Sequence, residues 1–212
     1  MARESAEEKL IRMTEIEREI ALSYPSCPIA GIDEVGRGPL AGPVVTACVS
    51  IPFSKLIPGV DDSKKLSEKK RESLYPLIIE NARYSKTAWI TPGEIDEINI
   101  LNATKKAMEI CASDLAGAVF LVDAVTGISL PGHIKSLVHG DAISYMIAAA
   151  SIVAKVERDR YMVELDQRYP MYGFIRNKGY GTKEHIEAIR TFGPCPEHRM
   201  SFIRKFLPAS KV

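Results

Sequence analysis

The sequence has few cysteines, no long apolar run and almost no net charge, and each of these shortages argues against a class of protein. Its four cysteines lie far apart without a C-x-x-C pair, which disfavours a zinc knuckle and a disulfide framework. The longest weakly polar run, 142–154, has 13 residues and is too short to cross a bilayer. The first twenty residues are charged throughout and lack the apolar stretch of a secretory signal. We therefore expect a cytoplasmic protein that does not span a membrane.

The composition is that of an ordinary globular chain with one basic end. The 212 residues are 46% hydrophobic and 26% charged, which supports one full core and argues against disorder or a repeat protein. The net charge of +1 conceals eight basic and three acidic residues in segment 176–212. Such a segment is either a solvated face or a phosphate-binding surface, and composition leaves both open.

The hydrophobic pattern predicts a single α/β domain with an N-terminal helix in 1–22, a core at 29–168 and a basic C-terminal appendage at 169–212. Helical periodicity occurs at 4–22, 67–82, 92–115, 142–168 and 182–191. Runs typical of strands occur at 29–35, 44–51, 84–90, 118–123 and 137–141. The first two runs predict a hairpin, and segments 52–63 and 169–181 are expected to be loops.

Four carboxylates stand where core residues or strand ends are expected. Asp33 and Glu34 interrupt the first apolar strand, Asp123 ends the fourth, and Asp141 lies between a strand and an apolar helix. Isolated carboxylates are costly to desolvate, so such acids call for cations or for pairing partners. If the strands are neighbours, the acids form a cluster that suits Mg²⁺ or Mn²⁺, because its ligands are all oxygens.

Each acid also has a simpler interpretation. Asp141 alone could cap the long helix, Asp123 could begin an Asx-turn, and the first pair could bind lysines at a sheet edge. Neighbouring strand residues point to opposite faces, so Asp33 and Glu34 share one metal site only if the strand twists or bulges near Gly36.

Several glycines, cations and aromatic residues are candidates for phosphate or sugar contacts. The sequence Gly36-Arg37-Gly38 offers main-chain N–H groups and a guanidinium beside the acids, although a tight hairpin turn explains it equally well. Lys64 and Lys65 lie at a loop-to-helix entry, where lysines are often merely solvated. Lys178 and Tyr180, flanked by glycines, combine a cation with an aromatic face, as nucleic-acid surfaces do.

These segments carry a resemblance to a known family. They are, in chain order, 31–44 (GIDEVGRGPLAGPV), 62–66 (DSKKL), 122–123 (VD), 140–141 (GD), 148–159 (AAASIVAKVERD) and 177–182 (NKGYGT). The chain resembles bacterial ribonuclease HII over about residues 29–206. The resemblance implies a ribonuclease H-like fold with a five-stranded mixed sheet flanked by helices, and cleavage of RNA in RNA–DNA hybrids or at ribonucleotides embedded in duplex DNA.

The resemblance also implies roles for the residues already singled out. The catalytic residues that hold two Mg²⁺ or Mn²⁺ ions would be Asp33, Glu34, Asp123 and Asp141. The turn that reads the sugar would be Gly36, Arg37 and Gly38, and the stacking residue would be Tyr180. Lys64, Lys65 and Lys178 are expected to bind phosphate, as their charges and positions indicate. The expected reaction is metal-dependent hydrolysis that leaves a 5′-phosphate and a 3′-hydroxyl, catalysed by a monomer.

Two positions depart from the family pattern. His139 stands where a lysine is frequent, which puts one phosphate contact in doubt, and Met146 replaces a frequent serine. Two other functions are weighed against this one. A structure-selective DNA nuclease on the same fold would cut all-DNA substrates, and a non-enzymatic hybrid-binding module would not need four mutually repelling acids.

Overall fold

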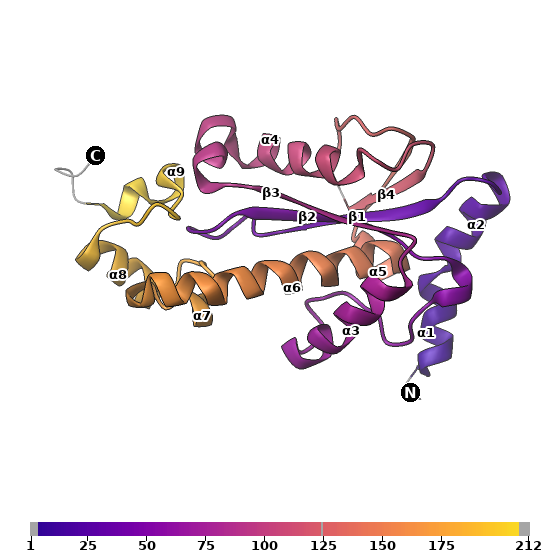
Figure 1. Cartoon of the computed structure of the whole chain (residues 1–212), viewed down its shortest axis with the longest axis horizontal. Coiled ribbons are helices and arrows are strands. Elements are labelled where there is room, and N and C mark those ends of the chain that lie inside the picture. The colour runs from indigo at the N-terminus through magenta and orange to yellow at the C-terminus, as the bar shows by residue number, and fades with distance from the viewer. Residues whose placement is uncertain (1–3, 124, 208–212) are drawn as a thin grey trace.

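A mixed five-stranded sheet forms the middle of the molecule in the computed structural model, which describes residues 4–123 and 125–207 (Figure 1). Its strands are β1 (Ile29–Val35), β2 (Val44–Ser50), β3 (Tyr84–Ile90), β4 (Val119–Asp123) and β5 (His133–Leu137). The strand order is β3-β2-β1-β4-β5, and β1 pairs antiparallel with β2 and parallel with β4. The strand that carries the first two acids is therefore central.

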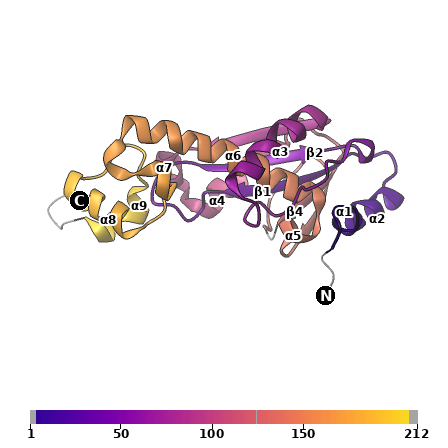
Figure 2. The same cartoon turned by 90° about the horizontal axis from the view of Figure 1, so that it is seen from below.

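Helices cover both faces of this sheet (Figure 1). Helix α4 (Pro92–Ala112) lies on one face, and α6 (Tyr145–Arg168) and α3 (Glu68–Asn81) lie on the other. The shorter helices of the described residues are α1 (Ala6–Met13), α2 (Glu15–Ser23), α5 (Gly140–Ile143), α7 (Phe174–Asn177), α8 (Lys183–Phe192) and α9 (Met200–Ile203). Figure 2 shows α8 and α9 gathered at one end of the molecule and α1 and α2 at the other. In the part of the chain that the structure describes, none of the helices combines the length and the apolar character needed to cross a bilayer.

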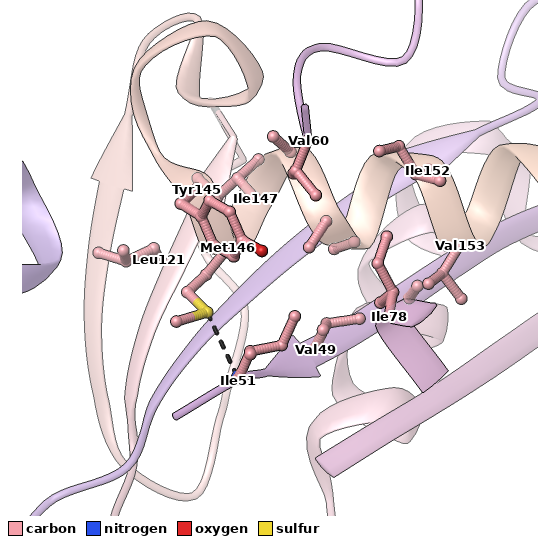
Figure 3. Packing of buried hydrophobic residues seen from close by; sticks show 14 of the residues in the cluster. Val49, Ile51, Val60, Ile78, Leu121, Tyr145, Met146, Ile147, Ile152 and Val153 are labelled. Carbon is pink, nitrogen blue, oxygen red and sulfur yellow. Dashed lines mark hydrogen bonds between the residues drawn. The ribbon is translucent and has the colours of Figure 1, made fainter. Parts of the chain in front are cut away.

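Helix α6 packs closely on β1 because a glycine lies where they cross. A Cβ atom built on Gly31 would lie 2.0 Å from the carbonyl carbon of Met146 and 2.2 Å from the Ile147 nitrogen. Beside this contact the Met146 side chain enters the core, where its sulfur accepts a hydrogen bond of 3.4 Å from the Ile51 N–H (Figure 3). The methionine that departs from the family pattern is thus a packing residue in this chain.

We expect Gly31→Ala to destabilise the protein strongly, because α6 would have to move away from β1. Overpacking a core costs about 1–3 kcal/mol, and more where backbone must shift. Thermal unfolding followed by circular dichroism measures the loss. The matched control is Gly93→Ala, since a Cβ at Gly93 meets nothing within 4 Å. Equal unfolding temperatures for the two variants would contradict the close packing of α6 on β1.

The sequence predicts the first four strands, whereas the predicted strand at 137–141 is wrong. The observed β5 spans His133–Leu137, and α5 begins at Gly140. This strand lies at the edge of the sheet with mostly exposed side chains, so it lacks the apolar pattern on which the prediction depends. His139 then adopts a left-handed conformation (φ 55°) that turns the chain into α5.

Two predicted helices are each divided by a hydroxyl residue. The helix predicted at 4–22 is α1 followed by α2, which meet at Thr14, whose Oγ1 donates to the Leu10 carbonyl at 2.8 Å. The helix predicted at 142–168 is divided at Ser144, which is extended and whose Oγ accepts from the Ile147 N–H at 3.2 Å. Threonine and serine side chains compete with helix backbone hydrogen bonds in this way, which apolar periodicity does not report. Residues 1–3 of the predicted N-terminal segment lie outside the described residues.

The helix predicted at 92–115 ends earlier, at Ala112, and is kinked at Asn99 (φ 63°), whose Oδ1 caps the following turn. The predicted loop at 169–181 contains a 3₁₀ turn (Pro170–Tyr172) and α7, elements of one turn that are too short for periodicity to detect. This region packs with α8, with α9 and with Leu40 of the β1–β2 connection in one apolar cluster. Residues 208–212 of the appendage lie outside the described part of the chain.

Candidate active site

The first pair of predicted site residues lies at the end of the central strand. Asp33 is buried, and its Oδ1 accepts a hydrogen bond of 2.8 Å from the Glu34 N–H. The pairing of β1 with β2 is regular up to Val35, so of the twist or bulge that a shared metal site requires, a bulge is absent from this ladder, and the chain turns at Gly36. The Glu34 Oε1 atom lies 3.5 Å from Arg37 Nη1. The two neighbouring acids therefore leave the strand in different directions.

The second pair comes from the adjacent strand and from the helix that follows it. Asp123 ends β4, which runs parallel beside β1, and Asp141 lies in the first turn of α5. A hydrogen bond of 2.9 Å from the Gly140 N–H to Asp123 Oδ1 joins these two segments. The alternative that Asp141 caps the long helix is wrong, because Ser144 caps α6.

The carboxylates lie close enough for their charges to interact. Burial, followed by the charge of Glu34 and of the two other aspartates, holds the pKa of Asp33 well above its ordinary value. Burial also raises the pKa of Glu34, although the Arg37 guanidinium opposes this shift. Negative charge is thus concentrated at the ends of β1 and β4.

One ammonium group reaches this cluster from the loop before α3. Lys64 Nζ donates to Asp141 Oδ2 at 2.8 Å, and this hydrogen bond raises the pKa of Lys64. The Lys64 side chain is 78% exposed, so it lies between the acids and solvent, with the exposed Lys65 beside it. Arg71 fixes the loop by donating to the Ser63 carbonyl at 2.9 Å.

The donor set fits a hard divalent cation. All four side chains offer carboxylate oxygens, and Glu34 Oε2 is buried without a hydrogen-bond partner. An unpartnered buried oxygen beside other acids is what a cation would satisfy. Within residues 4–123 and 125–207, no three His, Cys, Asp or Glu side chains already converge on one ion position. Lys64 neutralises part of the cluster in this arrangement.

The connection from β1 to β2 brings a main-chain turn beside the carboxylates. Gly36 has a φ of 90°, and a Cβ there would lie 2.3 Å from the Arg158 side chain, so only glycine fits. The next residues, Arg37 and Gly38, are exposed. A Cβ on Gly38 would lie 3.7 Å from Tyr180 Cε1, and the Tyr180 side chain is on the surface. The turn and the tyrosine ring therefore border one another.

The other predicted contact residues lie near this turn or near α5. The segment containing Lys178 is bound to the β1–β2 connection, since the Gly179 carbonyl accepts from the Leu40 N–H at 2.8 Å. Lys178 itself is half-buried. His139, which stands in place of a frequent lysine, is exposed two residues before Asp141.

Comparison with known proteins assigns this arrangement to a family. A family model described as Ribonuclease HII matches residues 30–205. The chain belongs to the ribonuclease HII family. A Ribonuclease HII of Acetivibrio thermocellus is 52% identical over 181 residues, covering 84% of this chain and 71% of that protein. One of Ruminiclostridium cellulolyticum is 49% identical over 202 residues, covering 94% of this chain and 79% of that protein. The chain is therefore a hydrolytic endonuclease of the ribonuclease H class.

Solved structures confirm the predicted fold. The ribonuclease H2 from Pyrococcus horikoshii OT3 is 27% identical with a TM-score of 0.70, over 84% of this chain and 96% of that chain. The ribonuclease H-like fold expected from the sequence is thus confirmed. A Bst-RNase HIII solved in complex with Mn²⁺ is 18% identical with a TM-score of 0.64, over 85% of this chain and 69% of that chain, and shares the fold.

Two buried arginines, which the sequence analysis does not single out, bind main-chain carbonyls around the candidate site of this ribonuclease HII chain. Arg199 donates to the Gly36 carbonyl at 2.6 Å and to the Arg37 carbonyl at 2.9 Å. Arg158 donates to the Lys178 carbonyl at 3.0 Å. Burial lowers the pKa of Arg199 to about 9 and that of Arg158 to about 10. The two guanidiniums therefore fix the turn and the Tyr180 segment by hydrogen bonds to their main-chain carbonyls.

A sequence signal exists for one of these arginines. Arg158 lies four residues after Ala154 and four before Met162, both buried residues of α6, so it falls on the apolar stripe of that helix. A charged residue in such a stripe indicates a buried partner. Arg199 has no comparable signal, because its carbonyl partners are more than 150 residues away along the chain.

Proposed function

We propose that this enzyme cuts the RNA strand of RNA–DNA hybrids and cuts 5′ to ribonucleotides embedded in duplex DNA, leaving 5′-phosphate and 3′-hydroxyl ends. The observation that carries this proposal is the cluster of Asp33, Glu34, Asp123 and Asp141 beside the Gly36–Gly38 turn. A cluster of acids alone would suit any metal-dependent phosphodiesterase and does not distinguish RNA from DNA. A main-chain turn next to an exposed aromatic ring adds a surface suited to a sugar.

The four carboxylates, with Asp33 at the centre of the cluster, would hold Mg²⁺ or Mn²⁺. When bound, such ions supply a water of lowered pKa for in-line attack and stabilise the leaving 3′-oxygen. The buried, unpartnered Glu34 Oε2 and the raised pKa of Asp33 support this assignment, because both features report negative charge that no protein group fully compensates.

The remaining residues bind and orient the substrate. Main-chain groups of Gly36 and Gly38, with the Arg37 guanidinium, contact the 2′-OH, the group that distinguishes RNA from DNA at one position. Tyr180 stacks on the sugar of the nucleotide that follows the last ribonucleotide on its 3′ side, where a ribose fits less well than a deoxyribose. The preferred cut is therefore at an RNA-to-DNA junction, 5′ to the last ribonucleotide. Lys64, Lys65 and Lys178 neutralise phosphates.

The test uses a duplex with one embedded ribonucleotide beside its all-DNA twin. We expect cleavage of the first only, and only with Mg²⁺ or Mn²⁺. Cleavage of both duplexes would favour a structure-selective DNA nuclease. Binding in EDTA without cleavage in Mg²⁺ would favour a hybrid-binding module.

The double variant Lys64→Ala/Lys65→Ala should bind hybrid and all-DNA duplexes equally less well, since phosphates are common to both. Binding releases about one counterion fewer for each phosphate contact that is lost. The slope of log K against log salt should therefore become shallower by about one to two. Fluorescence anisotropy in EDTA between about 50 and 200 mM salt measures this slope.

The control pair is Lys105→Ala/Lys106→Ala on α4, which lies on the opposite face of the sheet from the Lys64 loop. An unchanged slope for the Lys64/Lys65 variant, or the same change for the α4 pair, would mean that these lysines are only solvated.

A further inference from the structure

A row of hydrogen bonds connects Cys195 to the main chain of Tyr180 through two buried histidines. The Cys195 N–H donates to His198 Nδ1 at 3.0 Å. The Nε2 atoms of His198 and His185 lie 3.0 Å apart. His185 Nδ1 lies 2.8 Å from the Tyr180 carbonyl oxygen. The row therefore ends on the residue assigned to stacking.

The two ends of this row fix every proton in it. A carbonyl oxygen only accepts, so His185 carries its proton on Nδ1 and offers an unprotonated Nε2. His198 must then donate from its own Nε2, which leaves its Nδ1 free to accept from the Cys195 amide. Both rings are neutral, because a third proton would bring two N–H groups face to face.

The surroundings of the pair contain no compensating charge among the residues described. Tyr172 and Phe174 enclose the imidazoles, with ring centroids 4.7 Å from His198 and 5.4 Å from His185 respectively. The titratable groups that face the pair are the Tyr172 hydroxyl, which donates to the Gly193 carbonyl, and the Cys195 thiol, 3.2 Å from His198 Nδ1. Burial lowers the pKa of His198 to about 4 and also lowers that of His185, in keeping with neutral rings.

The same row is connected to the glycine turn. His198 precedes Arg199, whose guanidinium binds the Gly36 and Arg37 carbonyls, and His198 itself forms a β-bridge with Ala41. One short segment thus holds the turn through Arg199 and the Tyr180 carbonyl through the histidines. Together with the Leu40–Gly179 hydrogen bond and the Arg158–Lys178 hydrogen bond, this segment supports the spacing between the turn and the tyrosine.

We propose that His185, in the tautomer that His198 fixes, is a positioning residue that holds Tyr180 relative to the Gly36–Gly38 turn and thereby sets the preference for a deoxyribose on the 3′ side of the last ribonucleotide. The inference rests on the proposed function, because it assumes that Tyr180 stacks on that sugar. Neither histidine touches substrate. Their contribution is geometric, and displacements of about 1 Å at such a site change rates by up to about 100-fold.

The test compares His185→Gln with His185→Asn. An asparagine amide nitrogen falls near the Nδ1 position and still donates to Tyr180, whereas the longer glutamine places its amide near Nε2 and lacks that donor. The readout is the ratio of kcat/KM on an RNA-to-DNA junction duplex to that on an all-RNA hybrid, at equal Mg²⁺. We expect the ratio to fall about tenfold in His185→Gln and to stay within about twofold of wild type in His185→Asn.

Ile189→Val is the control, since Ile189 is buried on the same helix outside the row. A merely structural role would lower both kcat/KM values together and leave the ratio unchanged, which is the result expected of this control; the same result for His185→Gln overturns the inference. Tyr180→Ala is measured in parallel. If Tyr180→Ala changes the ratio and His185→Gln does not, the positioning role alone fails. If Tyr180→Ala leaves the ratio unchanged, the proposed stacking of Tyr180 is wrong, and the positioning role that rests on it is wrong with it.

A second measurement needs no variant. Imidazole ¹⁵N spectra of the wild-type protein at pH 7 should show His185 protonated on Nδ1 and His198 on Nε2. A cationic ring or the opposite pair of tautomers overturns the proposed row.

Discussion

Asp33→Asn should abolish cleavage of every substrate while leaving the protein folded. The substitution removes a full negative charge from the centre of the carboxylate cluster but keeps the shape of the side chain and the oxygen that accepts from the Glu34 N–H. Loss of a charge that would hold the metal ions removes several kcal/mol of transition-state stabilisation, so activity should fall by about 1,000-fold or more. Cleavage of a duplex with one ribonucleotide in Mg²⁺ measures the effect.

The same variant should be at least as stable as wild type in EDTA. Because the folded protein holds the pKa of Asp33 above its ordinary value, ionisation of Asp33 favours the unfolded state. This destabilisation is absent below the unfolded-state pKa of about 3.9 and grows as the pH rises towards the folded-state pKa. The advantage of asparagine should therefore be present at neutral pH and vanish in acid, which thermal unfolding at several pH values tests.

Asp114→Asn is the matched control, because Asp114 pairs with Lys86 on the surface and not with the cluster. It should keep wild-type activity. Wild-type cleavage by folded Asp33→Asn would remove Asp33 from the reaction. A lower stability of Asp33→Asn in EDTA at neutral pH would mean that protein groups, and not a metal ion, compensate the charge of the carboxylates.

The carboxylates could be found from the sequence because each one breaks a local pattern. A charge that interrupts or ends an apolar strand is visible without knowledge of its partners, and the pairing of β1 with β4 then brings Asp33 and Asp123 to neighbouring strand ends. The positions of the first four strands along the chain follow similar local signals, whereas their order in the sheet does not. The edge strand β5 has no apolar alternation, and the left-handed conformation of His139 leaves no mark on hydrophobic periodicity. The sequence therefore does not predict the structure of the segment before Asp141.

The supports of the site could not be found in the same way. Arg199 donates to main-chain carbonyls, and His198 pairs with a main-chain N–H and with another histidine; composition and periodicity do not identify such partners. A buried arginine without a carboxylate partner also resembles a solvated surface cation when only the sequence is known. The basic residues of segment 176–212 therefore differ in their surroundings. Arg199 is wholly buried and binds main chain, whereas Arg176, Lys183 and Arg190 are exposed.

Tyr180→Ala should lower cleavage at RNA-to-DNA junctions by one to two orders of magnitude, with a smaller effect on all-RNA hybrids. Stacking of an aromatic ring on a nucleotide contributes about 1–3 kcal/mol, which corresponds to this loss in rate. The ring is available for such a contact, since Tyr180 is 45% exposed and borders Gly38. The preference for the junction should decline because the all-RNA hybrid, whose ribose fits poorly against the ring, gains little from it in the wild-type enzyme.

Tyr180→Phe separates the ring from its hydroxyl. It keeps the stacking face, so its ratio of junction to all-RNA cleavage at equal Mg²⁺ should match wild type. The competing interpretation is a packed loop tyrosine, but the ring-to-ring contacts of this loop are made by Tyr172 and Phe174, 5.4 Å apart, while Tyr180 faces the surface. If Tyr180→Ala retains the wild-type junction preference, the ring is structural, and discrimination between ribose and deoxyribose must come from the Gly36–Gly38 main chain alone.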